Sequence, residues 1–462
     1  MTALSDRIWE LAETKFEEFA SAELLASKLD QSGFTVERGT GGLPTAFMAS
    51  YTQGTGGPII AFLGEYDALP GLSQQEGLAS QQPLQQGGSG HGCGHHLLGT
   101  GALAAAVALK GMMERHGMNG TIRYYGCPAE EGGSGKTFMV REKVFQGVDA
   151  ALTWHPGSDN AVVSHTSSAN YQVRYRFKGT SSHAAASPHL GRSALDAVEL
   201  MNVGANYLRE HMPKEAQFHY AVTDTGGFSP NVVQATAEVL YLIRAPEVCK
   251  VEELYIRIND VAKGAALMTG TEVHVEFEKA CSNLIPNVTL ERVMYQCFEG
   301  LGTPIFTEAE EQEARVMQTT LHAGEGSVVD GNAGYGNDEN TPPAALPVTL
   351  DVYEPDAGRM LGSTDVADVS WVVPTAQLET VCYAGQTPFH SWQMVAQGKS
   401  TAAHTGMLHA AKVMAATGAE LLTCPGIILD AKAELRSRGG LEGYVCPIPA
   451  HIRPPVRQMP NE

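Results

Sequence analysis

The fold is decided by the run Pro58-Ile59-Ile60-Ala61-Phe62-Leu63-Gly64. Its length and continuous apolar character are typical of a parallel strand that is buried on both faces. Further strands are predicted at residues 121–125 and 148–154, and helical periodicity predicts helices at residues 6–33 and 97–113. Strands that alternate with helices in this way predict an α/β fold with an open sheet.

Residues that can bind a cation or move a proton follow three of these strands. Asp67 comes after the first strand. The pair Glu130-Glu131 comes after the second, and His155 comes after the third. Because ligands of open α/β sheets bind at the carboxyl ends of the strands, we expect these side chains to share one site. One glutamate could then serve as a metal ligand and the other as a general base.

The helix predicted at residues 97–113 is preceded by the glycine-rich loop Gly90-His91-Gly92-Cys93-Gly94-His95-His96. Thiolate and imidazole groups are preferred ligands of zinc, and the spacing of Cys93 and His95 lets both side chains reach one point. Such a pair alone is a weak signal, but beside the strand-end residues it predicts half of a metal site. We expect His91 and His96 to form local hydrogen bonds instead.

The pattern of apolar and polar residues changes at about residue 171. From there, the pattern strand, helix, strand, strand, helix, strand predicts a ferredoxin-like α+β module. We expect this module to be an inserted second domain at residues 168–282. The first domain would then consist of residues 1–167 and 283–462.

The composition argues against several classes of partner. The net charge is −20, whereas nucleic acids and anionic membranes require a basic face. No apolar run approaches the roughly 20 residues that span a bilayer, and the N-terminus lacks the apolar core of a signal peptide. We therefore expect a cytoplasmic protein that binds neither nucleic acid nor a membrane. Eight cysteines in 462 residues are too few for a disulfide scaffold.

Short segments along the chain carry a family resemblance. They are, in order, residues 64–74 (GEYDALPGLSQ), 90–95 (GHGCGH), 130–138 (EEGGSGKTF), 153–156 (TWHP), 181–185 (SSHAA), 229–234 (SPNVVQ) and 362–366 (GSTDV). In these segments the chain resembles the amidohydrolase branch of the aminoacylase and glutamate carboxypeptidase metallopeptidases. The segments span nearly the whole chain in order, which makes the resemblance specific.

The resemblance implies two divalent metal ions, Zn²⁺ or Mn²⁺, and it suggests their ligands. Cys93 would bridge the two ions. His95 and His155 would complete one metal site. Glu131 and His390 would complete the other.

The resemblance also implies that residues 1–167 and 283–462 form the catalytic domain and that residues 168–282 form a lid and dimerisation domain. It further implies roles beside the metal ions. Glu130 would be the general base, and Asp67 would be the carboxylate that orients a ligand histidine. His183 would reach into the active site of a neighbouring protomer and stabilise the oxyanion there. Asn231 and Arg244 would hold the carboxylate of the substrate.

Several positions leave alternatives open. Alignment favours His390 as the source of the last imidazole, and His404 is the alternative. Many relatives carry an acidic residue where this chain has His96, which could change the metal preference or the fit of the substrate. Glu65 replaces a common aspartate. Lys136 follows a glycine-rich stretch that lacks the first half of a nucleotide phosphate loop, so we reject a nucleotide site there.

The implied activity is hydrolysis of the amide bond of N-acyl or N-aroyl amino acids. The favoured substrate is p-aminobenzoyl-glutamate, which would yield p-aminobenzoate and glutamate in folate catabolism. Acyl-aspartate and indole-acetyl amino acid conjugates are alternative substrates. A non-catalytic metal-binding protein is a further alternative, as is a thiol enzyme that uses Cys93, although its surroundings lack the positive charge that would activate a thiol. The partner would be a second copy of the chain, giving a homodimer, or a homologous chain, giving a heteromer.

Overall fold

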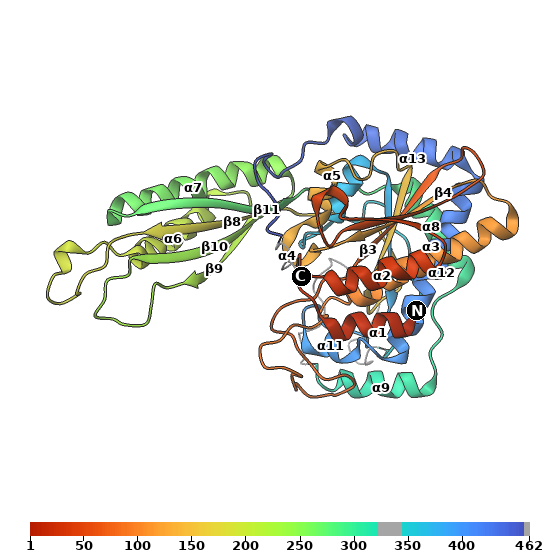
Figure 1. Cartoon of the computed structure of the whole chain (residues 1–462), viewed down its shortest axis with the longest axis horizontal. Coiled ribbons are helices and arrows are strands. Elements are labelled where there is room, and N and C mark those ends of the chain that lie inside the picture. Colours follow the sequence, from red (N-terminus) through yellow and green to blue (C-terminus); the bar gives the residue numbers. More distant parts are fainter. Residues whose placement is uncertain (322–343, 457–462) are drawn as a thin grey trace. The chain divides into compact units, whose positions relative to one another are not determined.

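The computed structural model describes residues 1–321 and 344–456. The chain forms two compact units (Figure 1). The first unit comprises Met1–Thr166, Leu284–Cys446 and residues 454–456, and the second comprises Ser167–Asn283 and Pro447–Arg453. The predicted boundaries assign Pro447–Arg453 to the catalytic domain, whereas this segment packs with the second unit.

A seven-stranded sheet forms the centre of the first unit. Its strands are β1 (Thr35–Arg38), β2 (Phe47–Gln53), β3 (Ile59–Glu65), β4 (Gly120–Cys127), β5 (Ala150–Gly157), β6 (Ala161–Val163) and β13 (Thr375–Val381). Their order in the sheet is β1-β2-β4-β3-β5-β13-β6. Strands β4, β3, β5 and β13 are parallel, and the outer strands pair in antiparallel fashion. The predicted α/β class with an open sheet is thereby confirmed, with the apolar run of β3 near its centre.

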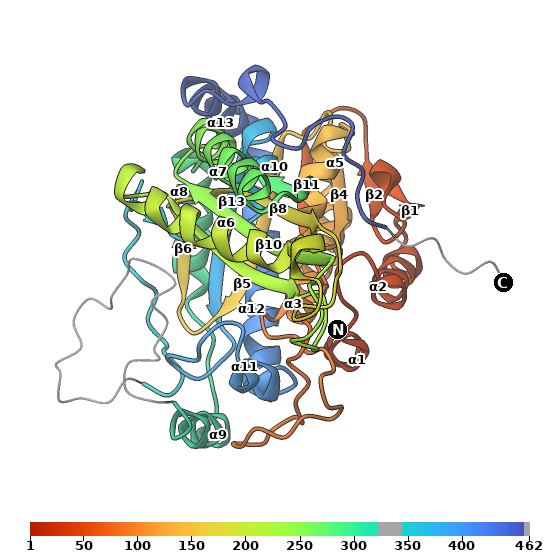
Figure 2. The same ribbon diagram turned by 90° about the vertical axis from the view of Figure 1, so that its left-hand side faces the viewer.

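The first unit also contains several helices. They are α1 (Thr2–Leu11), α2 (Phe19–Gln31), α3 (His95–His116), α4 (Glu130–Gly133), α5 (Gly135–Arg141), α8 (Val288–Leu301), α9 (Glu308–Gln318), α10 (Val366–Val372), α11 (Trp392–Gln397), α12 (Thr401–Thr423) and α13 (Pro425–Ser437). Helices α3 and α12 pack against each other and against the sheet (Figure 2). By length and composition α3 could span a membrane, but 67% of its apolar window is buried inside the protein, as expected of a core helix.

The single helix predicted at residues 6–33 is wrong, because the chain breaks between α1 and α2. Ala12 adopts a left-handed conformation with φ of 43°. The carboxylate of Glu13 then accepts hydrogen bonds from the N–H groups of Ala20 and Ser21, at 3.0 and 2.8 Å. This side chain satisfies donors in the first turn of α2, which explains why α2 begins anew. The Glu13 carbonyl also accepts a 2.8 Å hydrogen bond from the backbone N–H of Ala68, the residue that follows Asp67.

The second unit is a four-stranded antiparallel sheet with two helices. Its elements are β8 (Ala169–Lys178), α6 (Ala194–Leu208), β9 (Gln217–Asp224), β10 (Thr236–Ala245), α7 (Val248–Thr269) and β11 (Glu272–Cys281). The strands lie in the order β11-β8-β10-β9, so β9 forms an edge. This succession of strands and helices is the one that the sequence pattern predicts for a ferredoxin-like module.

Close contact between α3 and β5 places the glycine-rich loop that carries Cys93, just before α3, beside the sheet. The indole of Trp154 on β5 is fully buried and donates a 2.9 Å hydrogen bond to the carbonyl of Leu98 on α3. A Cβ atom at Gly101 would lie 2.6 Å from the Trp154 ring. The absence of a side chain at Gly101 therefore sets how closely α3 approaches β5.

We expect Gly101→Ala to destabilise the first unit by about 1–3 kcal/mol, because the new methyl group must displace a packed indole ring. The matched control is Gly111→Ala on the same helix, where a Cβ atom would meet nothing within 4 Å. This change should stabilise the helix by roughly 0.5–1 kcal/mol. Thermal and denaturant unfolding of both variants measures the difference, and equal effects of the two substitutions would contradict the proposed contact.

Candidate metal centre

The loop that carries Cys93 is held in place from both sides. Gly94 has φ of +75°, and a Cβ atom there would lie 2.4 Å from the Tyr383 hydroxyl and 2.6 Å from Pro156. The carbonyl of Gly92 accepts a 2.7 Å hydrogen bond from the N–H of His390. The loop is thus fixed against segments that lie far away in the sequence, with glycine required at position 94.

Cys93, His95 and His155 offer three ligand atoms that lie within 4.8 Å of one another. His95 is the first residue of α3, and His155 lies near the carboxyl end of β5. The Cys93 Sγ and His155 Nε2 atoms are 3.4 Å apart. The Nδ1 atom of His155 lies 3.1 Å from the carbonyl of Pro156, which fits a tautomer that donates there and leaves Nε2 available to a cation.

A second group consists of Cys93, Glu131 and His390, again with ligand atoms within 4.8 Å of one another. His390 Nε2 lies 3.3 Å from Glu131 Oε1. The His390 side chain is 54% exposed and the Glu131 side chain 9% exposed, so this group borders solvent. Since Cys93 belongs to both groups, one thiolate could bridge two cations.

Asp67 connects the two groups through its two oxygen atoms. Its Oδ1 atom lies 2.8 Å from His95 Nδ1. Its Oδ2 atom accepts a 2.9 Å hydrogen bond from the backbone N–H of Glu131. The contact with Nδ1 directs His95 Nε2 toward Cys93 and His155, as a carboxylate does behind a metal-binding histidine.

Two buried atoms of these groups fit a bound cation. His95 Nε2 and Glu131 Oε1 are buried and form no hydrogen bond of good geometry within the part of the chain that the structure describes, although Glu65 Oε2 lies 3.2 Å from the first atom and His390 Nε2 lies 3.3 Å from the second. Leaving such atoms unsatisfied is costly. A divalent cation would satisfy both, and a set of thiolate, imidazole and carboxylate ligands suits zinc, with imidazole and carboxylate also suiting manganese.

The two adjacent glutamates differ in their electrostatic environment. Burial, followed by the carboxylates of Glu65 and Glu131, raises the pKa of Glu130 well above its ordinary value. Burial also raises the pKa of Glu131, but His390 and His95 outweigh this effect and bring it to about 2. Such a divergence is typical of a pair in which one carboxylate stays ionised and the other exchanges protons.

The electrostatic surroundings also shift the pKa values of His155 and Cys93. Burial and then His95 lower the pKa of His155 to about 3, so this imidazole is neutral and can bind a cation. Burial and then Glu131 raise the pKa of the Cys93 thiol. The surroundings of Cys93 therefore do not activate it as a free nucleophile, in contrast to those of catalytic thiols.

Three other histidines of the first unit lie outside both groups. His404 Nε2 is 2.8 Å from Asp6 Oδ1. His91 Nε2 lies 3.1 Å from the carbonyl of Ile8, and His96 Nε2 lies 2.8 Å from the carbonyl of Gly398. Each of these three imidazoles thus has a local structural partner.

Three predicted site residues belong to the second unit. His183 is exposed, and its Nδ1 atom accepts hydrogen bonds from the N–H groups of Ala185 and Ala186, at 3.3 and 3.2 Å. Asn231 is exposed. Arg244 is half-buried on β10, where burial lowers the pKa of its guanidinium.

Sequence reasoning missed the buried ion pairs beside the centre. The ammonium of Lys136 lies 2.6 Å from Glu65 Oε1 and 2.6 Å from Asp365 Oδ1. In the sequence, Glu65 stands out only as a departure from a common aspartate, and Asp365 only as part of a matching segment. The available signal is a lysine among glycine and apolar residues at the start of a helix, and a lysine that is buried there needs an acidic partner.

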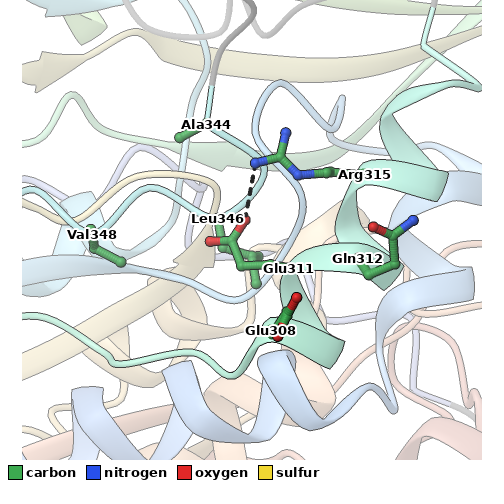
Figure 3. Close-up of a pocket in the computed structure, with 7 residues that line it drawn as sticks. All are labelled: Glu308, Glu311, Gln312, Arg315, Ala344, Leu346 and Val348. Carbon is green, nitrogen blue, oxygen red and sulfur yellow. Dashed lines mark ion pairs between the residues drawn. The ribbon is translucent and has the colours of Figure 1, made fainter.

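A separate pocket of about 540 Å³ lies along α9 (Figure 3). It is lined by Glu308, Glu311, Gln312, Arg315, Ala344, Leu346 and Val348. Glu311 and Arg315 form an ion pair across 3.8 Å. The predicted site residues do not line this pocket, and its lining contains neither thiol nor imidazole, so we assign it no role in the chemistry.

The open α/β sheet and the two ligand groups that share Cys93 define the class of a metal-dependent hydrolase. Residues 61–354 match the model of Peptidase family M20/M25/M40. The chain belongs to this family, and the predicted family resemblance is confirmed. It is a metal-dependent amidohydrolase, as expected from the sequence.

Curated relatives agree with this assignment, and a solved structure shares the fold. The chain is 51% identical over 460 residues to the B subunit of p-aminobenzoyl-glutamate hydrolase from Escherichia coli K12, covering 98% of this chain and 95% of the relative. It is 29% identical to mouse Xaa-Arg dipeptidase, with 94% and 89% covered. The fold is similar to that of an aminobenzoyl-glutamate utilization protein from Klebsiella pneumoniae, with a TM-score of 0.56, 18% identity, and 88% and 94% of the two chains covered.

We expect His390→Ala to lose the cation held by the group of Cys93 and Glu131, because no other imidazole belongs to that group among the described residues. His404→Ala is the matched control, since His404 pairs with Asp6 instead, and it should keep the wild-type cation content. Elemental analysis after equilibrium dialysis against Zn²⁺ or Mn²⁺ measures the cations bound per chain. The reverse pattern would assign the ligand role to His404.

Proposed function

We propose that this chain hydrolyses the amide bond of p-aminobenzoyl-glutamate and releases p-aminobenzoate and glutamate. The observation that carries this proposal is the 51% identity, over nearly the whole chain, to one of the subunits of p-aminobenzoyl-glutamate hydrolase. Indole-3-acetyl-aspartic acid hydrolase of Enterobacter agglomerans is 27% identical over 254 residues. Conjugates of other amino acids are therefore the second class of substrate to test.

Two divalent cations, Zn²⁺ or Mn²⁺, would bind at the paired groups. Cys93 would bridge them, with His95 and His155 on one cation and Glu131 and His390 on the other. A bound pair of this kind polarises an amide carbonyl and lowers the pKa of water, so that hydroxide is available near neutral pH.

Glu130 is the residue that we assign as general base. It belongs to neither group that contains Cys93, yet its carboxylate lies within 4.8 Å of the ligand atoms of His95 and Glu65. In this position it would accept the proton of the attacking water and pass it to the nitrogen of the leaving amine. Asp67 would hold His95 and Glu131 in place during both proton transfers.

His183 is suited to donate a hydrogen bond to an oxyanion. Because its Nδ1 atom accepts two backbone hydrogen bonds, the proton of the neutral ring is on Nε2. The ring is exposed and could therefore serve the active site of a neighbouring protomer. Asn231 and Arg244 would hold the carboxylate of the glutamate moiety.

The second unit has a surface suited to such a partner. Its edge strand β9 exposes Tyr220 and Val222, and α6 exposes Val203 and Tyr207. An unpaired edge strand with apolar side chains favours association with another chain. The A subunit of the Escherichia coli hydrolase is also similar, at 28% identity over 254 residues. We therefore propose that the partner is either a second copy of this chain or a homologous chain.

We expect the protein loaded with Zn²⁺ or Mn²⁺ to release p-aminobenzoate from p-aminobenzoyl-glutamate, and Glu130→Gln to lower kcat by about 10²–10⁴-fold with its cations retained. Chromatography of the product and elemental analysis measure the two quantities. The matched control is Glu310→Gln, because Glu310 lies in the capping box of α9, where glutamine can replace glutamate.

Three outcomes would contradict this function. Wild-type activity of Glu130→Gln would exclude Glu130 as the base. Activity that survives removal of the cations by a chelator would favour a thiol enzyme. Hydrolysis of indole-acetyl-aspartate or acyl-aspartate, but not of p-aminobenzoyl-glutamate, would reassign the substrate.

We expect His183→Ala to be inactive alone and to regain activity in mixed oligomers with Glu130→Gln, because one intact site can then combine Glu130 of one chain with His183 of the other. His189→Ala, another exposed histidine of the same unit, is the matched control and should be active alone. Activity is measured after the two variants are unfolded, mixed and refolded together. Absence of any recovered activity would argue against a contribution across protomers.

A further inference from the structure

Three charged side chains are buried together beside the candidate metal centre. Lys136, Glu65 and Asp365 are 0%, 2% and 1% exposed. The ammonium of Lys136 contacts both carboxylates at 2.6 Å, and the backbone N–H of Lys136 donates a further 2.8 Å hydrogen bond to Asp365. Since buried charges persist only when they are paired, the two carboxylates depend on this one ammonium.

The second oxygen of Glu65 faces a predicted metal ligand. Glu65 Oε2 lies 3.2 Å from His95 Nε2, the atom that would bind a cation. Glu65, His95 and Glu130 form a third group whose ligand atoms lie within 4.8 Å of one another. A cation in this third group would occupy His95 and the general base Glu130 together. It would therefore compete with the arrangement centred on Cys93.

We propose that Lys136 is a positioning residue that keeps Glu65 from binding a cation at the metal centre; this inference rests on the proposed metal groups around Cys93. A carboxylate already neutralised by an ammonium at 2.6 Å gains less from a second cation than a free carboxylate does. Asp365 also contacts the ammonium, at 2.6 Å, and so helps to keep Lys136 at Glu65. His95 is thereby reserved for the group with Cys93, and Glu130 stays available for proton transfer.

The test is a titration with Co²⁺ in the absence of substrate, followed by the absorption band of a thiolate bound to cobalt. The wild-type protein should develop this band. Lys136→Met should bind Co²⁺ at the group of Glu65, His95 and Glu130, so the cobalt affinity reported by the thiolate band should fall by about 10–100-fold. The matched control is Lys432→Met, whose ammonium pairs with Asp149 before the amino end of β5, and it should titrate as the wild type does.

Two double variants make the test independent of the stability of Lys136→Met. Lys136→Met combined with Glu65→Gln keeps only the Asp365 charge, and Lys136→Met combined with Asp365→Asn keeps only the Glu65 charge. The two proteins bury the same net charge, so both should fold equally well. We expect the first to restore the cobalt affinity reported by the thiolate band to within a few-fold of the wild type and the second to keep the loss of about 10–100-fold.

The outcomes separate this inference from the proposed function. Equal thiolate bands in the two double variants would overturn the role of Lys136, as would a wild-type titration of a folded Lys136→Met protein. A wild-type protein that binds Co²⁺ without any thiolate band would instead overturn the metal groups around Cys93. Thermal unfolding of each variant confirms that folded proteins are compared.

Discussion

The centre depends on one carboxylate that holds two ligands at once. Asp67 contacts the imidazole of His95 with one oxygen and the backbone N–H of Glu131 with the other. The contact with His95 positions a ligand of the group that contains His155. The contact with Glu131 positions a ligand of the group that contains His390. Asp67 itself is fixed because the next residue, Ala68, is hydrogen-bonded to Glu13 in the turn between α1 and α2. The relative position of the two ligand groups is therefore built into β3 and the loop that follows it.

Much of this arrangement could be predicted from the sequence, because it follows from local patterns. A continuous apolar run predicts the buried strand β3, and polar residues directly after successive parallel strands must meet at one edge of the sheet. That rule alone is enough to bring Asp67, Glu131 and His155 together. The types of ligand then follow from the preference of cations for thiolate, imidazole and carboxylate groups.

Other features could not be predicted, since they depend on contacts between distant segments. The pairing of Lys136 with Glu65 and Asp365 joins three segments with no common motif. The break between α1 and α2 depends on the side chain of Glu13, which satisfies N–H groups in the first turn of α2. The packing of Pro447–Arg453 with the second unit likewise leaves no periodic signal in the sequence.

The bond between His390 and Gly92 has a consequence for the order in which the centre assembles. The ligand groups draw on residues that lie from position 93 to position 390, and closing so long a loop costs conformational entropy. The 2.7 Å hydrogen bond between the His390 N–H and the Gly92 carbonyl closes that loop with backbone atoms alone. The folded chain, rather than an incoming cation, thus brings the last imidazole to the thiol. Metal loading is accordingly expected to be a late event that follows completion of the sheet, unlike the case of small domains that fold only around their metal.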